Sequence, residues 1–114
     1  MKLQQYFECT ELILIDEISM VGRQMMGRID TRLRQATAGR YNSDDLLGGL
    51  SAVCVGDPAQ CEAIMDQQMY DKDPHKRTND MEEDSAAKLS NAGLNVYTQF
   101  DEVIILTHVH RLHT

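Results

Sequence analysis

The sequence has few basic residues, few cysteines and no long hydrophobic run, and each shortage excludes a class of protein. Its 11 lysines and arginines against 18 aspartates and glutamates give a net charge of -7. This excludes a free-standing module that binds nucleic acid through overall positive charge. The three cysteines form no CxxC pair and no disulfide-framework spacing, so we interpret them as reduced thiols. No apolar run approaches the length of a membrane span, and the opening MKLQQYFE lacks the apolar core of a secretory signal.

Three aliphatic runs predict strands. The length of 114 residues, with 42% hydrophobic and 25% charged residues, suits one small globular domain. Residues 12–15 (LILI) are continuously apolar, which predicts a strand buried on both faces, as in a parallel sheet. Residues 50–55 predict a second strand with small residues inside it, and residues 103–106 (VIIL) predict a third.

The segments between these runs predict two helices and two loops. From residue 19 onward, an apolar residue recurs every fourth position, which predicts an amphipathic helix. Its stripe consists of Val21, Met25, Ile29 and Leu33. Residues 38–49 predict an exposed loop, and the polar residues 66–85 predict a flexible insertion. Residues 86–100 contain helix formers interrupted by Gly93. This order of elements predicts an α/β fold.

Two acids follow the first predicted strand directly. Asp16 and Glu17 would lie at its carboxyl end, where parallel sheets bind their ligands. A nucleotide hydrolase needs such a pair, since one carboxylate holds the water shell of Mg²⁺ and its neighbour polarises the attacking water. The alternative is that both acids only favour the dipole of the following helix. The strand end alone leaves both interpretations open.

The second predicted strand ends in a similar way. Gly56, Asp57, Pro58, Ala59 and Gln60 place a tight turn, an acid and an amide after it. The glutamine would report the terminal phosphate of a nucleotide, whereas the alternative is an ordinary Asp-Pro turn. The two strand ends together favour nucleotide chemistry more strongly than either does alone.

Three segments in this order, LILIDEISMV, LGGLSAVCVGDPAQ and VIILTHVHR, resemble the PIF-one helicase family, which is related to RecD within helicase superfamily one. The resemblance runs from about residue 10 to residue 111. It implies a RecA-like P-loop NTPase domain with a mostly parallel sheet flanked by helices. It also implies an ATP-dependent DNA helicase that unwinds DNA from 5′ to 3′, with ATP and single-stranded or forked DNA as partners.

The resemblance assigns a role to each site residue. Asp16 and Glu17 match the Walker B acids, with Asp16 as the Mg²⁺ ligand and Glu17 as the residue that activates water. Gly56, Asp57 and Gln60 match the third helicase motif, with Gln60 as sensor of the γ-phosphate. Arg111 matches the arginine of the fourth motif, which would stabilise charge on the transferred phosphoryl group. Taken alone, Arg111 would be read as a solvated surface arginine.

The sequence also departs from the family pattern. It contains no GxxxxGK[ST], and therefore no backbone nest for phosphates and no phosphate-binding lysine. Gln60 is followed by Cys61-Glu62-Ala63-Ile64, where the family has an apolar, proline-containing stretch. We expect residues 1–114 to correspond to the C-terminal part of one motor domain, from Walker B to the fourth motif, without the second motor domain, and to be inactive alone. The alternative is a degenerate, non-catalytic domain that serves as an interaction module or is a pseudogene product.

The remaining polar residues allow two interpretations each. The histidines 108, 110 and 113 invite a zinc site, but no cysteine lies close to them in sequence, and satisfied or exposed histidines suffice to explain them. The arginines between residues 23 and 40 would touch DNA phosphates or simply form a solvated helix face. Cys54 alternates within a strand, which is typical of a buried small hydrophobe. We expect an intracellular protein without a membrane partner, in the nucleus or mitochondrion if eukaryotic and otherwise in the cytoplasm. The resemblance further implies DNA repair, recombination and telomere maintenance.

Overall fold

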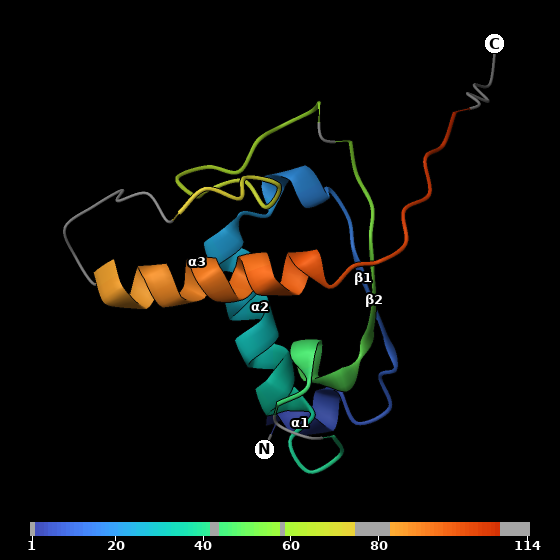
Figure 1. Cartoon of the computed structure of the whole chain (residues 1–114). Helices are drawn as coiled ribbons and strands as arrows, with labels where there is room; N and C mark the ends of the chain where they lie inside the picture. The colour runs from blue at the N-terminus through green and yellow to red at the C-terminus, as the bar shows by residue number, and fades with distance from the viewer. Residues whose placement is uncertain (1, 42–43, 58, 75–82, 108–114) are drawn as a thin grey trace.

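The computed structural model describes residues 2–41, 44–57, 59–74 and 83–107, and over these ranges the expected α/β class is confirmed (Figure 1). In chain order the elements are α1 (Lys2–Tyr6), β1 (Leu12–Ile15), the 3-10 helix η1 (Ile18–Met20), α2 (Arg23–Ala36), the 3-10 helix η2 (Leu46–Gly49), β2 (Ser51–Cys54) and α3 (Glu83–Thr98). Within the described ranges, no helix combines the length and the apolarity that a membrane span requires.

The two strands pair in parallel, as their apolar sequences predict. Leu12 lies opposite Ser51 and Ile15 lies opposite Cys54. The prediction that β1 is buried on both faces is wrong, because Leu12 and Leu14 are exposed while Ile13 and Ile15 pack against the core. Burial in β2 alternates in the same way. The described helices therefore cover one face of this sheet and leave an apolar face open.

The predicted apolar stripe is confirmed at Val21, Ile29 and Leu33, which lie in or against the core, and is wrong at Met25. Met26 and Leu33 are buried together with Ala36, whereas Met25 is 47% exposed. A step of four residues turns the helix by about 400°, so a row of every fourth residue drifts around it by about 40° per step. The buried side chains instead follow a mixed spacing of three and four residues.

Helix α3 crosses α2 at two glycines (Figure 1). A Cβ on Gly93 would collide with the carbonyl oxygen of Arg23, and one on Gly27 would collide with the carbonyl oxygen of Leu89. Gly93 does not interrupt the predicted helix, since α3 runs through it to Thr98. Both glycines allow the two backbones to approach each other closely.

The segment between α2 and β2 is not the uniformly exposed loop that its composition predicts. Leu47 and Gly48 are buried in η2, and Leu47 belongs to the hydrophobic core. The Asp30 carboxylate accepts a hydrogen bond from the Leu47 amide at 2.6 Å, and the Thr37 hydroxyl donates to the Gly48 carbonyl oxygen at 2.8 Å. These contacts from α2 hold the two residues in place.

The third predicted strand is wrong over its described residues. Residues 103–106 are 77–89% exposed, and no strand is formed between residues 101 and 107. Among the described residues, no backbone hydrogen bond joins this segment to β1 or β2. An apolar run becomes a strand only when a neighbouring strand edge satisfies its amides and carbonyls.

Candidate functional site

The ends of β1 and β2 lie side by side, and the hydrogen bonding between them continues past the strands. The Val55 amide donates to the Ile15 carbonyl oxygen at 2.8 Å, and the Ile18 amide donates to the Val55 carbonyl oxygen at 3.0 Å. Asp16 and Glu17 lie between these two bonds, so both acids face the end of the neighbouring strand. The parallel pairing thus brings the two predicted motifs to one edge of the sheet.

Backbone geometry sets the positions of the two acids. Glu17 has φ 52° and ψ 51°, a left-handed conformation that is uncommon for residues other than glycine. Its amide donates to the Asp16 carboxylate at 2.8 Å, and its carbonyl oxygen accepts from the Met20 amide at 3.0 Å. Both side chains are exposed. The turn therefore presents two neighbouring carboxylates to solvent at the strand end.

Gly56 is the point of closest approach between the two loops. A Cβ at this position would lie 2.8 Å from the Ile18 amide nitrogen and 3.0 Å from Ile18 Cγ2. A larger residue would push the loop of Asp16 and Glu17 away from the loop after β2. The glycine of the predicted third motif thus has a steric role at the site.

A turn after Gly56 projects the predicted sensor. The Asp57 carboxylate accepts from the Ala59 amide at 2.9 Å, and the Asp57 carbonyl oxygen accepts from the Gln60 amide at 3.0 Å. The side chain of Gln60 is exposed. The turn is the one that the Asp-Pro alternative predicts, and it also carries Gln60 beyond the same strand end, so both interpretations remain compatible with its geometry.

Some predicted site residues lie outside the described ranges. These are Pro58, Arg111 and the three histidines at 108, 110 and 113. Within the described ranges, no group of three His, Cys, Asp or Glu side chains is placed to hold a metal ion.

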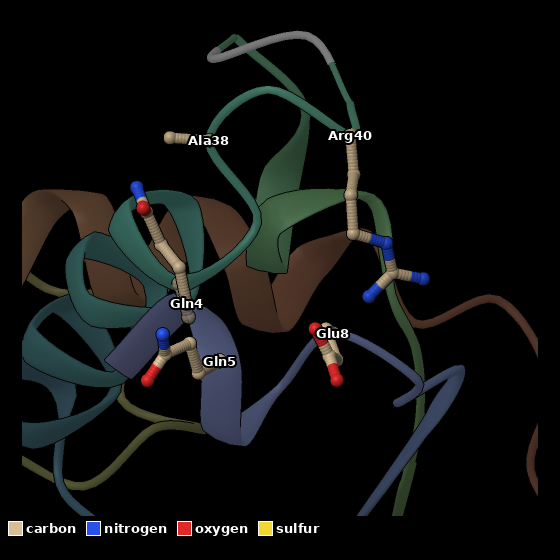
Figure 2. A pocket seen from close by; sticks show the side chains of 6 residues that line it. Gln4, Gln5, Glu8, Ala38 and Arg40 are labelled. Atoms are coloured by element: carbon tan, nitrogen blue, oxygen red, sulfur yellow. The ribbon is translucent and has the colours of Figure 1, made fainter. Parts of the chain in front are cut away.

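A cavity of about 240 Å³ lies away from the candidate site, between α1 and the residues that follow α2, where Gln4, Gln5 and Glu8 face Ala38 and Arg40 (Figure 2). The Arg40 guanidinium donates there to the carbonyl oxygens of Phe7 and Thr10 at 2.7 and 3.1 Å. Figure 1 places α1 at the opposite end of the strands from η1. This cavity is therefore remote from Asp16.

A second cavity of about 130 Å³ lies beside η1. It is lined by residues of η1, of the segment 68–70 and of α3. Ser19 is one of them, and its buried hydroxyl has no hydrogen-bond partner among the described residues. This cavity adjoins the candidate site from the side of the core.

Arg23 is an exception to the interpretation of the arginines as a solvated face or a DNA contact, whereas Arg28, Arg32 and Arg40 are exposed as a solvated face requires. Arg23 is fully buried. Its guanidinium donates to the carbonyl oxygens of Ser90, Asp71 and Asp73 at 3.3, 3.1 and 2.6 Å, and to Asn91 Oδ1 at 3.2 Å. Residues 71 and 73 belong to the predicted flexible insertion, which over residues 66–74 contacts α2. Residues 75–82 of that insertion lie outside the described ranges.

Cys54 is half-buried in β2, and burial raises the pKa of its thiol. A raised pKa keeps the sulfur as the neutral thiol, which is a poor nucleophile. This supports the interpretation of Cys54 as a small hydrophobic residue.

Comparison of the sequence with models of protein families supports the resemblance. The family model described as PIF1-like helicase matches residues 1–112, a range that includes both strand ends and the residues that follow α3. Comparison with curated proteins and with solved structures gives no match.

Proposed function

The chain belongs to the PIF1-like helicase family, and on this basis we propose that residues 1–114 are the part of a RecA-like motor domain that extends from the Walker B acids to the fourth helicase motif. The parent activity is hydrolysis of ATP coupled to unwinding of DNA from 5′ to 3′. The observation that carries the proposal is the hydrogen bond from Ile18 to Val55, which joins the loop of Asp16 and Glu17 to the loop of Gly56 and Gln60.

Each of the four proposed site residues has one task in the proposed reaction. Asp16 would hold Mg²⁺, which when bound would supply positive charge to neutralise the ATP phosphates. Glu17 accepts a hydrogen bond from the attacking water and aligns it with the γ-phosphate. Gln60 contacts the same phosphate from the neighbouring loop, so that its position depends on whether that phosphate is present. Arg111 stabilises the charge that develops on the transferred group.

The fixed geometry of the two loops supports this division of tasks. Phosphoryl transfer depends on positioning and on electrostatic stabilisation, with little covalent chemistry for the protein to perform. Glu17 sits in a defined turn and Gly56 packs against Ile18, so the loop of the acid and the start of the loop of the sensor are in contact before any nucleotide binds. Such preorganisation is what a hydrolytic site requires.

The isolated chain should not turn over ATP, because the sequence contains no GxxxxGK[ST] to cradle the phosphates. The test is a steady-state ATPase assay of the purified chain with and without single-stranded DNA, alongside the Glu17→Gln variant. We expect both proteins to stay at the buffer background. If the unsubstituted chain hydrolyses ATP and the Glu17→Gln substitution abolishes that hydrolysis, the predicted inactivity is contradicted.

The missing GxxxxGK[ST] motif also supports a second candidate function. A domain that keeps the fold but lacks a phosphate loop would serve as a non-catalytic interaction module or be the product of a degenerating gene. The genomic sequence upstream of the Met1 codon separates the two candidates. An in-frame strand followed by a GKT-type loop favours the motor, whereas stop codons in that stretch favour the degenerate domain.

A further inference from the structure

The N-terminus of α2 is capped by a residue far away in the sequence. The first amides of a helix have no partner within it, and a Ser, Thr, Asp or Asn directly before the helix usually accepts from the second or third of them. Here that position is Gly22, which has no side chain to do so. Instead, the carboxylate of Asp66 accepts from the amides of Gln24 and Met25, both at 3.1 Å.

Gly22 and Asp66 are sterically complementary. A Cβ on Gly22 would collide with the Cβ, Cγ and Oδ2 atoms of Asp66. The carboxylate therefore occupies the space in which the capping side chain of residue 22 would otherwise lie. It also places a negative charge at the positive end of the α2 dipole, where such a charge is stabilising.

The two partners belong to the two loops of the candidate site. Gly22 follows Glu17 through η1, and Asp66 follows Gln60 along the chain after β2. The Arg23 amide also donates to the Gln67 carbonyl oxygen at 2.8 Å, and Gly22 forms an antiparallel bridge with Gln68. The loop after β1 and the loop after β2 are thus joined by hydrogen bonds twice, first at the strand ends and again at the start of α2.

We infer that Asp66 is a positioning residue that fixes the loop of Glu17 relative to the loop of Gln60, so that a displacement of either loop is transmitted to the other. The transmission to catalysis rests on the proposed function of Glu17 and Gln60. The mechanical link rests on the hydrogen bonds that the amides of Arg23, Gln24 and Met25 donate to residues 66 and 67. The mechanical link and its effect on catalysis can therefore be disproved separately.

Amide hydrogen exchange followed by NMR on the whole chain tests the link. The Asp66→Ala variant should speed exchange of the Gln24 and Met25 amides by about fivefold, the usual effect of losing an N-cap. It should also speed exchange of the Gln60 and Ala63 amides, which lie in the loop that Asp66 anchors. Asp101→Ala removes the same charge from an exposed residue and should change none of the four amides.

A second variant separates capping from linking. Combining Gly22→Ser with Asp66→Gly, which also removes the Cβ that a side chain at residue 22 would meet, gives α2 a capping side chain from its own chain end. This double variant should restore slow exchange at Gln24 and Met25. The Gln60 and Ala63 amides should stay fast, because the cap no longer joins the two loops. Restoration of all four amides would overturn the inference and leave Asp66 as a cap only, and so would an Asp66→Ala variant in which Gln60 and Ala63 are unchanged.

If the Asp66→Ala variant folds poorly, the double variant still tests the inference, because it keeps a helix cap. Gly22→Ala alone supplies an independent check, because its methyl group displaces the Asp66 carboxylate. It should reproduce the faster exchange at Gln60 and Ala63. No step of these measurements uses nucleotide, so absence of ATP binding would count against the proposed function and not against the link.

Discussion

At the scale of single residues, the most demanding environment in the molecule belongs to Arg23. A buried guanidinium is tolerated only when its donors are satisfied, because an unpaired buried charge is very costly. Arg23 meets this requirement through carbonyl and amide oxygens from residues 71 and 73 and from α3. One side chain thereby joins three segments that are far apart in the sequence.

Replacing Arg23 should therefore cost far more than replacing an exposed arginine on the same helix. We expect Arg23→Met to lower the free energy of unfolding by about 3 kcal/mol, since hydrogen bonds from a buried charged donor are lost. Arg32 is exposed and donates to the exposed Gln35 side chain, so Arg32→Met should change that energy by no more than about 0.5 kcal/mol. Urea denaturation followed by circular dichroism measures the free energy of unfolding of both variants. Equal midpoints for the two variants would refute the stabilising role of Arg23.

Residues differ in how far the sequence reveals their roles. Asp16, Glu17, Gly56 and Gln60 stand out because each follows an apolar run that is readable as a strand. Arg23 and Asp66 do not, because their partners lie tens of residues away and their importance comes from burial and hydrogen bonding. The only local signal is Gly22, a helix start without a capping side chain, which implies a cap supplied from elsewhere.

At the scale of elements, the crossing of α2 and α3 depends on the absence of two side chains. Gly27 and Gly93 let each helix backbone touch the carbonyl oxygen of the other. A carbonyl oxygen within a helix cannot move aside as a flexible side chain can. The crossing is therefore intolerant of even one added methyl group.

Gly93→Ala should destabilise the chain although alanine is the better helix former. The propensity gain of about 1 kcal/mol is outweighed by overpacking, which we expect to cost about 3 kcal/mol or more at a backbone contact. Asn95→Ala, at an exposed position of α3, should be neutral or slightly stabilising. Thermal melts of both variants give the comparison, and a higher melting temperature for Gly93→Ala would mean that the helices do not cross there.

Element prediction succeeds where local pattern decides the structure and fails where a partner decides it. The parallel strands β1 and β2 and the helix containing residues 86–98 follow from apolar runs and helix formers. Residues 103–106 have an equally strong apolar pattern but no strand edge beside them. Likewise, Leu47 is buried because Asp30 and Thr37 reach the segment from α2, which turn composition does not reveal.

At the scale of the whole molecule, apolar surface is exposed on two sides. Leu12 and Leu14 form part of the open sheet face, and residues 103–106 form a second apolar stretch. Such surface together with open strand edges promotes self-association, and the net charge of -7 opposes it only at low ionic strength. The chain should therefore aggregate more as salt is added.

Ile105→Glu should suppress this aggregation without changing stability, because Ile105 is 77% exposed. Ile13→Glu is the matched control, since Ile13 packs against the core and a buried carboxylate there should unfold the chain. Light scattering at increasing salt, combined with urea denaturation, separates the two effects. Loss of stability in Ile105→Glu would show that residues 103–106 are packed in solution.

The proposed ATP-dependent function requires a nucleotide site at the joined ends of β1 and β2. Paramagnetic broadening by Mn²⁺ with ATP locates such a site even when binding is weak, because Mn²⁺ takes the oxygen ligands that Mg²⁺ takes. We predict that the amide signals of Asp16, Glu17, Gly56 and Gln60 broaden first and that Asp16→Asn removes the effect. Broadening centred on any other part of the chain, or unchanged by Asp16→Asn, would contradict the proposed site.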